Sequence, residues 1–315
     1  MRLRRFGPRA AEHGTSGDEG CASDESQPSE RPSSERGHQR VSIGVVVIVS
    51  GRLDHLARTL AGLARQTHQP DDVVVVDMDG DGGVGDVVER SAVRARIVPL
   101  PPWPAGLPLG PARNAGAAAL RTEQLVFLDV DCIPSTGLVD GYRRALDSHP
   151  QALLCGDVRY LRRGWMEKVA DDVGDRSFES SSAPHPARPT VTGGVQLDDQ
   201  HELFWSLSFA IGQGRWDELG GFDEGFIGYG GEDTDLALRA RLLGAPMAWV
   251  PGATAFHQWH APTRHDPVRI DEIVRNAHHF HGRWGTWPMT GWLRELAATG
   301  ALTFDERQGP RLIES

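Results

Sequence analysis

Residues 41–77 read VSIGVVVIVSGRLDHLARTLAGLARQTHQPDDVVVVD. The near-continuous β-branched run at 41–49 is typical of a strand buried on both faces of a parallel sheet. Apolar residues at helical spacing follow over 53–66, and Gln69-Pro70 ends that helix. Residues 72–77 form a second buried strand. Strand, helix and strand within about 35 residues predict a βαβ unit.

The same alternation of elements continues to about residue 150. It predicts an α/β fold with a doubly wound, mostly parallel central sheet flanked by helices. Ligands of such sheets bind beyond the carboxyl ends of the strands. Asp77 and Asp129 both fall at predicted strand ends, so we expect them near a ligand.

Composition divides the chain into further segments. Residues 1–40 are rich in Ser, Glu, Arg, Gly and Pro, which predicts a disordered tail. The folded part is expected to have a first half at 41–150 and a second half at 151–265. Residues 266–315 are rich in Trp and His and are predicted to form a helical carboxyl-terminal extension.

Charge and cysteine content narrow the class of protein. The formal net charge of −10 argues against a binder of duplex nucleic acid, which usually carries a basic patch. Three cysteines match neither a disulfide framework nor a zinc ribbon, and they favour the reducing cytoplasm. No apolar run approaches the roughly 20 residues of a membrane span. We expect neither a secretory signal nor a transmembrane segment, and peripheral membrane contact stays open.

Carboxylates follow the strand predicted at 125–129. Asp129-Val130-Asp131 places two acids one residue apart on a turning backbone, where both can face a cleft. Their hard oxygen ligands suit Mg²⁺ or Mn²⁺, which can bridge phosphate oxygens. His257, at the end of a later strand-like segment, could complete such a site.

A glycine-rich block at 228–235 reads GYGGEDTD. Its glycines, including Gly230 and Gly231, allow the backbone to approach a ligand closely. Adjacent charges repel, so Glu232 and Asp233 together favour a site in which one carboxylate acts as a base. Asp235 is equally well explained as a helix cap.

Residues 110–116 read GPARNAG and place Arg113 at a helix start. There an arginine and free backbone N–H groups can hold a diphosphate. An ordinary first helical turn is the alternative for this segment.

Together these motifs resemble the family-2-like glycosyltransferases of the GT-A fold over roughly residues 41–285. The first strand with Arg52, the second strand with Asp77 and Asp79, the Arg113-Asn114 segment and the Asp129–Asp131 motif follow their order. The segment from Gly220 to Asp235 and the later His257 resemble the carboxyl-terminal block of β-1,4-galactosyltransferases.

The resemblance implies a role for each matching residue. The donor nucleotide sugar would be bound by Arg52, Asp77, Asp79, Arg113, Asn114 and Asp129. The metal, Mn²⁺ or Mg²⁺, would be held by Asp131, His257 and Asp129, of which Asp129 is nearer the donor ribose or sugar. The acceptor would contact Tyr229, Gly230, Gly231 and Glu232, and Asp233 would be the catalytic base.

The implied reaction moves a hexose from a nucleotide-diphosphate sugar, such as a UDP-sugar, to an acceptor hydroxyl with inversion. Glycan, lipid-linked and small-molecule acceptors are all compatible, and so is a retaining outcome. Two other classes stay open: a non-catalytic nucleotide-sugar or glycan-binding module, and a sugar-1-phosphate nucleotidyltransferase.

Overall fold

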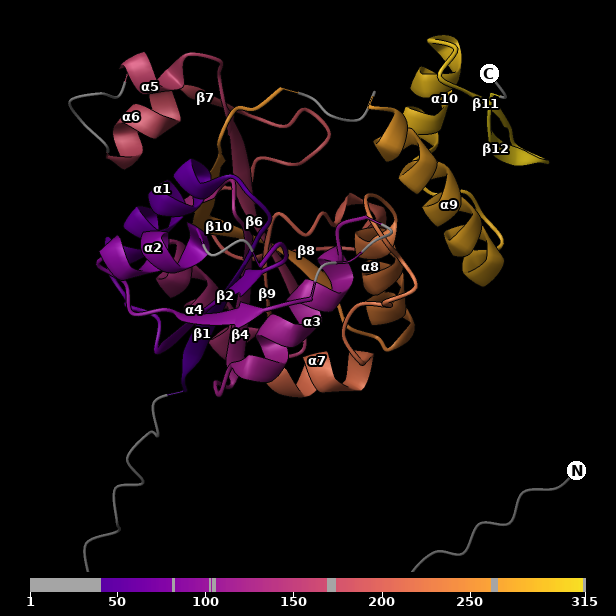
Figure 1. Ribbon diagram of the computed structural model, residues 1–315. Coiled ribbons are helices and arrows are strands. Elements are labelled where there is room, and N and C mark those ends of the chain that lie inside the picture. The colour runs from indigo at the N-terminus through magenta and orange to yellow at the C-terminus, as the bar shows by residue number, and fades with distance from the viewer. Residues whose placement is uncertain are drawn as a thin grey trace, which may run out of the picture. The chain divides into compact units, whose positions relative to one another are not determined.

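The computed structural model describes residues 41–80, 83–101, 103, 106–168, 174–261 and 266–313 (Figure 1). The tail predicted at 1–40 therefore lies outside the described residues. The described residues all belong to one compact unit.

The first half forms the predicted βαβ units. Its elements are β1 (Ile43–Val49), α1 (Leu53–Ala64), β2 (Asp72–Asp77), α2 (Gly83–Arg90), β3 (Arg96–Pro99), α3 (Leu109–Ala119) and β4 (Gln124–Asp129). β1 pairs in parallel with β2 on one side and with β4 on the other. All seven residues of β1 are buried, as the unbroken apolar run predicts.

The second half adds strands of both directions to the same sheet. Its elements are β5 (Cys132–Pro134), α4 (Leu138–Ser148), β6 (Leu153–Leu161), α5 (Trp165–Lys168), α6 (Asp175–Ser180), β7 (Ser182–Pro184), β8 (Gln196–Asp198), η1 (His201–Leu203), β9 (Ser208–Gly212), α7 (Gln213–Leu219), α8 (Glu232–Leu242) and β10 (Met247–His257). The main path of the sheet runs β3-β2-β1-β4-β9-β6-β10-β5. β9 is antiparallel to both of its neighbours, whereas β6 and β10 are parallel.

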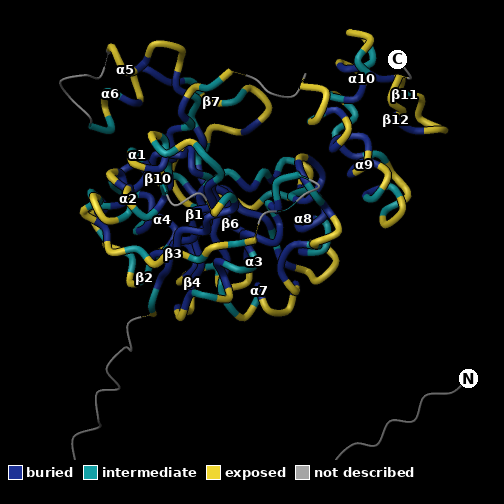
Figure 2. Tube along the Cα trace, viewed as in Figure 1, coloured by how far each residue is buried: buried dark blue, intermediate teal, exposed yellow. Residues whose placement is uncertain are grey.

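Helices cover both faces of this sheet (Figure 1). Apolar side chains of α1, α2 and α4 pack on one face, and those of α3, α7 and α8 pack on the other. The strands between them are the most continuously buried part of the chain (Figure 2). The predicted fold class, a mostly parallel sheet flanked by helices, is confirmed.

The predicted helical extension is only partly helical. It contains α9 (Pro267–Trp284) and α10 (Thr290–Ala298), but then a hairpin of β11 (Leu302–Asp305) and β12 (Gly309–Leu312). Gly300 and Gly309 have positive φ angles, which allow the chain to leave α10 and to turn into β12. The prediction of helix to the end of the chain was therefore wrong for 302–312.

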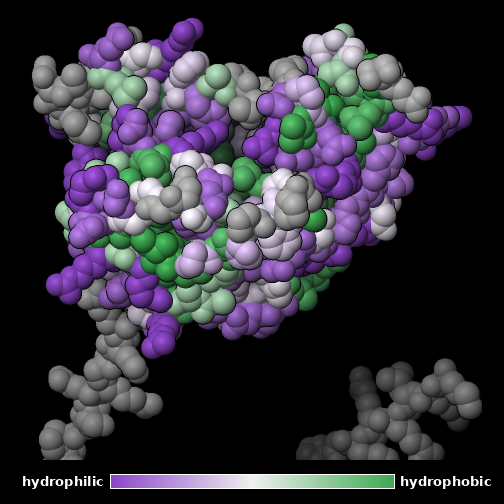
Figure 3. All heavy atoms as spheres, viewed as in Figure 1, coloured by the Kyte–Doolittle hydropathy of each residue, from purple (hydrophilic) through white to green (hydrophobic). Residues whose placement is uncertain are grey.

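The surface is largely hydrophilic on the face drawn in Figure 3, with hydrophobic side chains in separate patches. Among the described residues, no helix combines the length and apolar character needed to cross a membrane.

The packing of α3 on the sheet gives a stability prediction. A Cβ at Gly116 would overlap Val46 of β1, whereas a Cβ at Gly85 of α2 would meet open space. We expect Gly116→Ala to lower the free energy of unfolding by about 1–3 kcal/mol, because the close-packed helix must move.

The matched variant Gly85→Ala should be neutral or stabilise the chain by up to about 1 kcal/mol, since alanine favours helix. Urea unfolding of both variants tests this. Equal stabilities would contradict the tight packing of α3 on β1.

Candidate active site

Three potential metal ligands converge at the carboxyl edge of the sheet. Asp131 follows β4. The antiparallel pairing of β10 with β5 brings His257 opposite Cys132, the residue that follows Asp131 in the chain. His257 Nε2 lies 3.5 Å from Asp131 Oδ1, and His260 Nε2 lies 3.5 Å from Oδ2. One ligand atom from each residue falls within 4.8 Å of the others, so the three side chains could hold one cation.

The charge of Asp131 is strongly stabilised. Burial alone would raise its pKa, but His257, His260 and the guanidinium of Arg52 together hold the pKa well below its usual range. Arg52 Nη1 is 2.5 Å from Asp131 Oδ2. Arg52 has a φ of 45°, an uncommon left-handed conformation for a residue with a side chain. Asp131 is therefore an ionised carboxylate with cationic and imidazole groups around it.

Asp129, which was also predicted to bind the metal, is not one of these three ligands and binds an arginine instead. Its Oδ1 accepts a hydrogen bond of 2.8 Å from Arg113 Nη2. Arg113 is buried in α3, and its Nη1 lies 3.6 Å from Glu232 Oε1 at the start of α8. Within the described residues, Arg113 Nη1 and Glu232 Oε2 are buried atoms without a hydrogen-bond partner. Arg113 thus joins the Asp129–Asp131 motif to the glycine-rich block.

Two adjacent carboxylates begin α8 and have different environments. Glu232 is buried, and burial first, then the charge of Asp233, raises its pKa to about 7. Asp233 is half-buried, and burial raises its pKa although Thr234 donates a 2.7 Å backbone hydrogen bond to it. Asp235 is fully buried and accepts hydrogen bonds from Arg239, among others.

Asp77 and Asp79, two of the residues predicted to bind the donor, lie at the end of β2 beside the loop after β1. Asp79 accepts hydrogen bonds from Ser50 Oγ at 2.8 Å and from Gly51 N at 2.5 Å. Asp77 Oδ1 accepts from the backbone N–H groups of Asp79 and Gly80, both at 3.1 Å. These bonds fix the loop that precedes Arg52.

Asn114, another residue predicted to bind the donor, lies beside the segment that precedes the glycine-rich block. Its amide exchanges hydrogen bonds with the backbone of Phe222 at 2.8 and 3.0 Å and donates to Glu224. In this structure Asn114 therefore fastens α3 to the segment before the glycine-rich block.

The glycine-rich block contacts the carboxyl-terminal extension. The ring of Tyr229 stacks on Trp292 of α10, with centroids 5.6 Å apart. Its backbone N–H donates to Glu272 of α9 at 3.1 Å. A side chain at Gly230 would meet Met289, so the extension closely covers this part of the block. The predicted acceptor residues thus share a surface with the extension.

Two residues of the site were not predicted. The position of His260 beside Asp131 depends on the loop after β10, which no local sequence pattern predicts. Tyr160 lies opposite His257 on the neighbouring strand β6, with ring centroids 4.9 Å apart. In the sequence Tyr160 carries no signal beyond its position at a strand end.

Comparisons with known proteins agree with this geometry. The family model for glycosyl transferase family 2 matches residues 44–215, and a model described as the N-terminal domain of galactosyltransferase matches 196–260. Validoxylamine A glucosyltransferase of Streptomyces hygroscopicus subsp. limoneus is 30% identical over 65% of this chain and 49% of its own length. Hyaluronan synthase of Pasteurella multocida is 25% identical over 70% of this chain and 25% of its own. The chain thus spans about half the length of these relatives or less.

Among solved structures, GalNAc-T7 with UDP, GalNAc and Mn²⁺ superposes with a TM-score of 0.53 at 13% identity, covering 82% of this chain and 55% of that one. This likeness shows the shared fold, which is the GT-A fold predicted from the motifs. Since the first family model covers more than half of the 315 residues, the chain belongs to glycosyl transferase family 2.

Proposed function

We propose that the chain is a metal-dependent glycosyltransferase that moves a hexose from a UDP-sugar to an acceptor hydroxyl. One observation carries this proposal. The buried guanidinium of Arg113 contacts Asp129 beside the metal-ligand group and Glu232 beside the candidate base, so donor and acceptor chemistry meet around one residue. Among the described residues, Arg113 Nη1 has no hydrogen-bond partner, and it lies 3.6 Å from Glu232 Oε1.

The ligand group fits a divalent cation. Asp131, His257 and His260 supply one carboxylate and two imidazoles, a set that suits Mn²⁺ better than Mg²⁺. The bound ion would neutralise charge on the departing nucleotide diphosphate. The solved structure of GalNAc-T7, which contains UDP and Mn²⁺ together, supports this choice.

The donor nucleotide is assigned to the loop after β1. Asp77 and Asp79 present carboxylates at the end of β2, where base or ribose hydroxyls can donate to them. Arg52 lies between this loop and Asp131, so its guanidinium is placed to meet phosphate oxygens. Asp129 would orient the sugar through its contact with Arg113.

Asp233 is assigned as the base. The acceptor hydroxyl oxygen attacks the anomeric carbon, the bond from that carbon to the diphosphate breaks, and the hydroxyl proton passes to Asp233. A single displacement inverts the configuration. Glu232 suits acceptor binding instead, because it is buried and held near Arg113.

The two described cysteines, Cys132 and Cys155, are unpaired and buried, which supports a cytoplasmic location.

Replacement of the base tests the assignment. Asp233→Asn keeps the size of the side chain but cannot accept the proton, so we expect kcat to fall by about 10²–10⁴-fold. Binding of UDP with Mn²⁺, measured by calorimetry, should change little.

The matched control is Asp217→Asn, an exposed aspartate on α7. It should retain full turnover of a UDP-sugar panel. Near-normal turnover by Asp233→Asn would place the base elsewhere, and failure of the wild type to bind UDP with Mn²⁺ would overturn the transferase proposal.

The metal site yields a second test. His260→Ala should weaken Mn²⁺ binding at least ~10-fold, since even outer-shell partners of metal ligands contribute that much. Binding can be followed by electron paramagnetic resonance of free Mn²⁺. His149→Ala, at the end of α4, serves as the control. If His260→Ala bound Mn²⁺ with unchanged affinity, His260 would not be a metal ligand.

The environment of Glu232 predicts a pH-dependent stability. Its pKa of about 7 exceeds the value near 4.3 of an unfolded chain, so its protonated form stabilises the fold and this contribution is lost as pH rises through about 7. Glu232→Gln should therefore be more stable than the wild type, by an amount that grows from pH 5 to pH 8 to on the order of 2–3 kcal/mol.

Urea unfolding at the two pH values measures this effect. Glu89→Gln, at an exposed position of α2, should show no such pH-dependent gain. A Glu232→Gln variant that loses stability at pH 8 would mean that the ionised carboxylate stabilises the fold through Arg113.

A further inference from the structure

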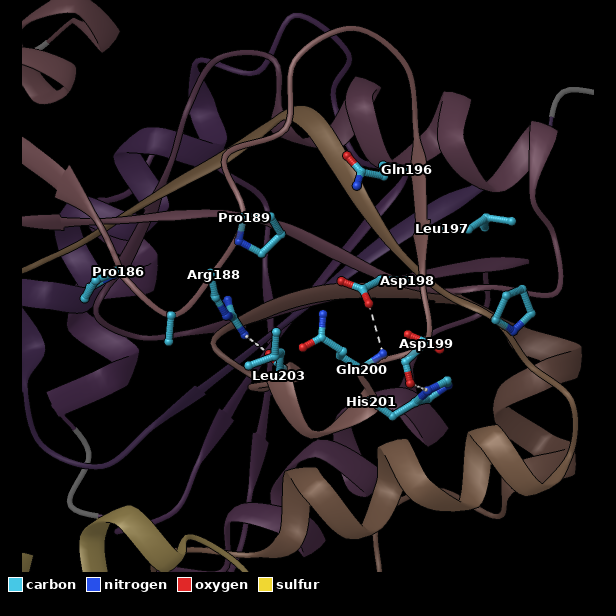
Figure 4. A pocket seen from close by; sticks show the side chains of 12 residues that line it. Pro186, Arg188, Pro189, Gln196, Leu197, Asp198, Asp199, Gln200, His201 and Leu203 are labelled. Carbon is cyan, nitrogen blue, oxygen red and sulfur yellow. Dashed lines mark hydrogen bonds between the residues drawn. The ribbon is translucent and has the colours of Figure 1, made fainter.

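Buried charged side chains also occur away from the candidate active site. Arg188 lines a cavity of about 830 Å³ (Figure 4). Its Nη2 donates to the carbonyl oxygens of Leu203 at 3.1 Å and Trp205 at 3.3 Å. These bonds join segments of the protein itself, so the guanidinium braces the wall of this cavity and points to no ligand. The buried acid of helix α9 has a different setting.

Glu272 of α9 lies beside the glycine-rich block and is only 2% exposed. Its Oε2 accepts a hydrogen bond of 2.6 Å from Arg269 Nη1 and another of 3.1 Å from the backbone N–H of Tyr229. A buried carboxylate is tolerated only where charges and hydrogen bonds compensate it. Glu272 therefore fastens the backbone of the block to α9 at Tyr229.

Two glycines make room for this carboxylate. A Cβ at Gly228 would overlap the carboxyl group of Glu272, and so would a Cβ at Gly106. Both glycines also have positive φ angles, which residues with a side chain rarely adopt. The backbone N–H of Gly228 donates to the carbonyl oxygen of Leu107 at 2.9 Å, so the two glycine segments are joined as well. The close approach of Glu272 thus depends on residues from three separate parts of the sequence.

The last turn of the same helix holds the other end of the block. Asp235 is fully buried, and its Oδ1 accepts hydrogen bonds of 2.9 Å from Arg283 Nε and from Trp284 Nε1. Arg283 Nη1 also lies 2.9 Å from Oδ2 of Asp223, which precedes the block. One guanidinium therefore joins the start of α8 to the segment before the block.

The candidate base lies between these two anchors. Gly230 and Gly231 precede it, with φ angles of 105° and 91° and no side chains to pack. A reacting group must be held closely in place, since a shift of about 1 Å can lower a rate by about 10²-fold. Because the two glycines cannot brace this stretch by side-chain packing, its contacts with α9 determine where Asp233 lies.

We propose that Glu272 and Arg283 are positioning residues for the transfer reaction, which hold the glycine-rich block from both ends so that Asp233 faces the donor. The link to catalysis rests on the proposed function. The anchoring itself rests on the hydrogen bonds from α9 and on the glycines that admit Glu272.

Amide hydrogen exchange of the full chain tests the anchors without any substrate. In Glu272→Ala and in Arg283→Ala, exchange over residues 228–235 should be at least ~10-fold faster than in the wild type, because the block loses an anchor. Asp271→Ala and Arg294→Ala are the matched controls. Both remove an exposed charge whose ion partner, Arg275 or Glu306, lies within the extension, so exchange over 228–235 should stay unchanged.

Release of UDP from UDP-glucose, UDP-galactose and UDP-N-acetylgalactosamine with Mn²⁺ tests the link to catalysis. In both variants kcat should fall about 10–10²-fold while the Kd of UDP with Mn²⁺ changes less than about twofold, since neither residue is assigned to the donor. Glu272→Gln keeps an oxygen that can accept from Tyr229 N–H, so it should recover most of kcat. Arg283 is exposed, so Arg283→Ala keeps the test decisive if Glu272→Ala does not fold.

Unchanged hydrogen exchange over 228–235 in both variants would overturn the anchors. Faster exchange with an unchanged kcat would overturn the positioning role. If the wild type did not bind UDP with Mn²⁺, the proposed function would be rejected, and the exchange experiment would still decide whether α9 anchors the block.

Discussion

The buried guanidinium of Arg113 is the constraint around which the catalytic edge is organised. A cation inside a protein is tolerated only where opposite charges and hydrogen bonds compensate it. Asp129 and Glu232 provide that compensation from β4 and α8, which are far apart in the sequence. Removing Asp129, which accepts the 2.8 Å hydrogen bond from Arg113, would leave the buried charge less compensated. Arg113 therefore fixes the separation between the two halves of the site.

The start of α8 shows how neighbouring acids take different tasks. Three carboxylates occur in its first turn, where the partial positive charge of a helix amino terminus favours them. Glu232 turns inward to Arg113, and Asp233 stays half-buried at the cleft. Asp235 is fully buried and accepts hydrogen bonds from Arg283 and Trp284 of α9. One helical turn thus connects the core, the cleft and the carboxyl-terminal extension.

The sequence was informative where local pattern determines structure. Unbroken β-branched runs predicted β1 and β2, and the strand end predicted the place of Asp129. β9 was missed because its direction depends on pairing with β4 and β6, which lie far away in the chain. The position of His260 likewise depends on a long-range contact, the 2.7 Å hydrogen bond from Gln258 N to Asp131 O. Contacts between residues that lie far apart in the chain leave no periodic pattern in the local sequence, so they could not be predicted from it.

The pairing of strands explains why these residues meet at one edge. β10 runs parallel to β6, so its carboxyl end reaches the same edge of the sheet as Tyr160. The short strand β5, which follows Asp131, pairs with the carboxyl end of β10. This pairing places Asp131 beside His257. The candidate metal ligands Asp131, after β4, and His257, at the end of β10, therefore become neighbours although other strands separate β4 from β10 in the sheet. Burial raises the pKa of both Glu232 and Asp233, so the pair favours one negative charge over two beside Arg113.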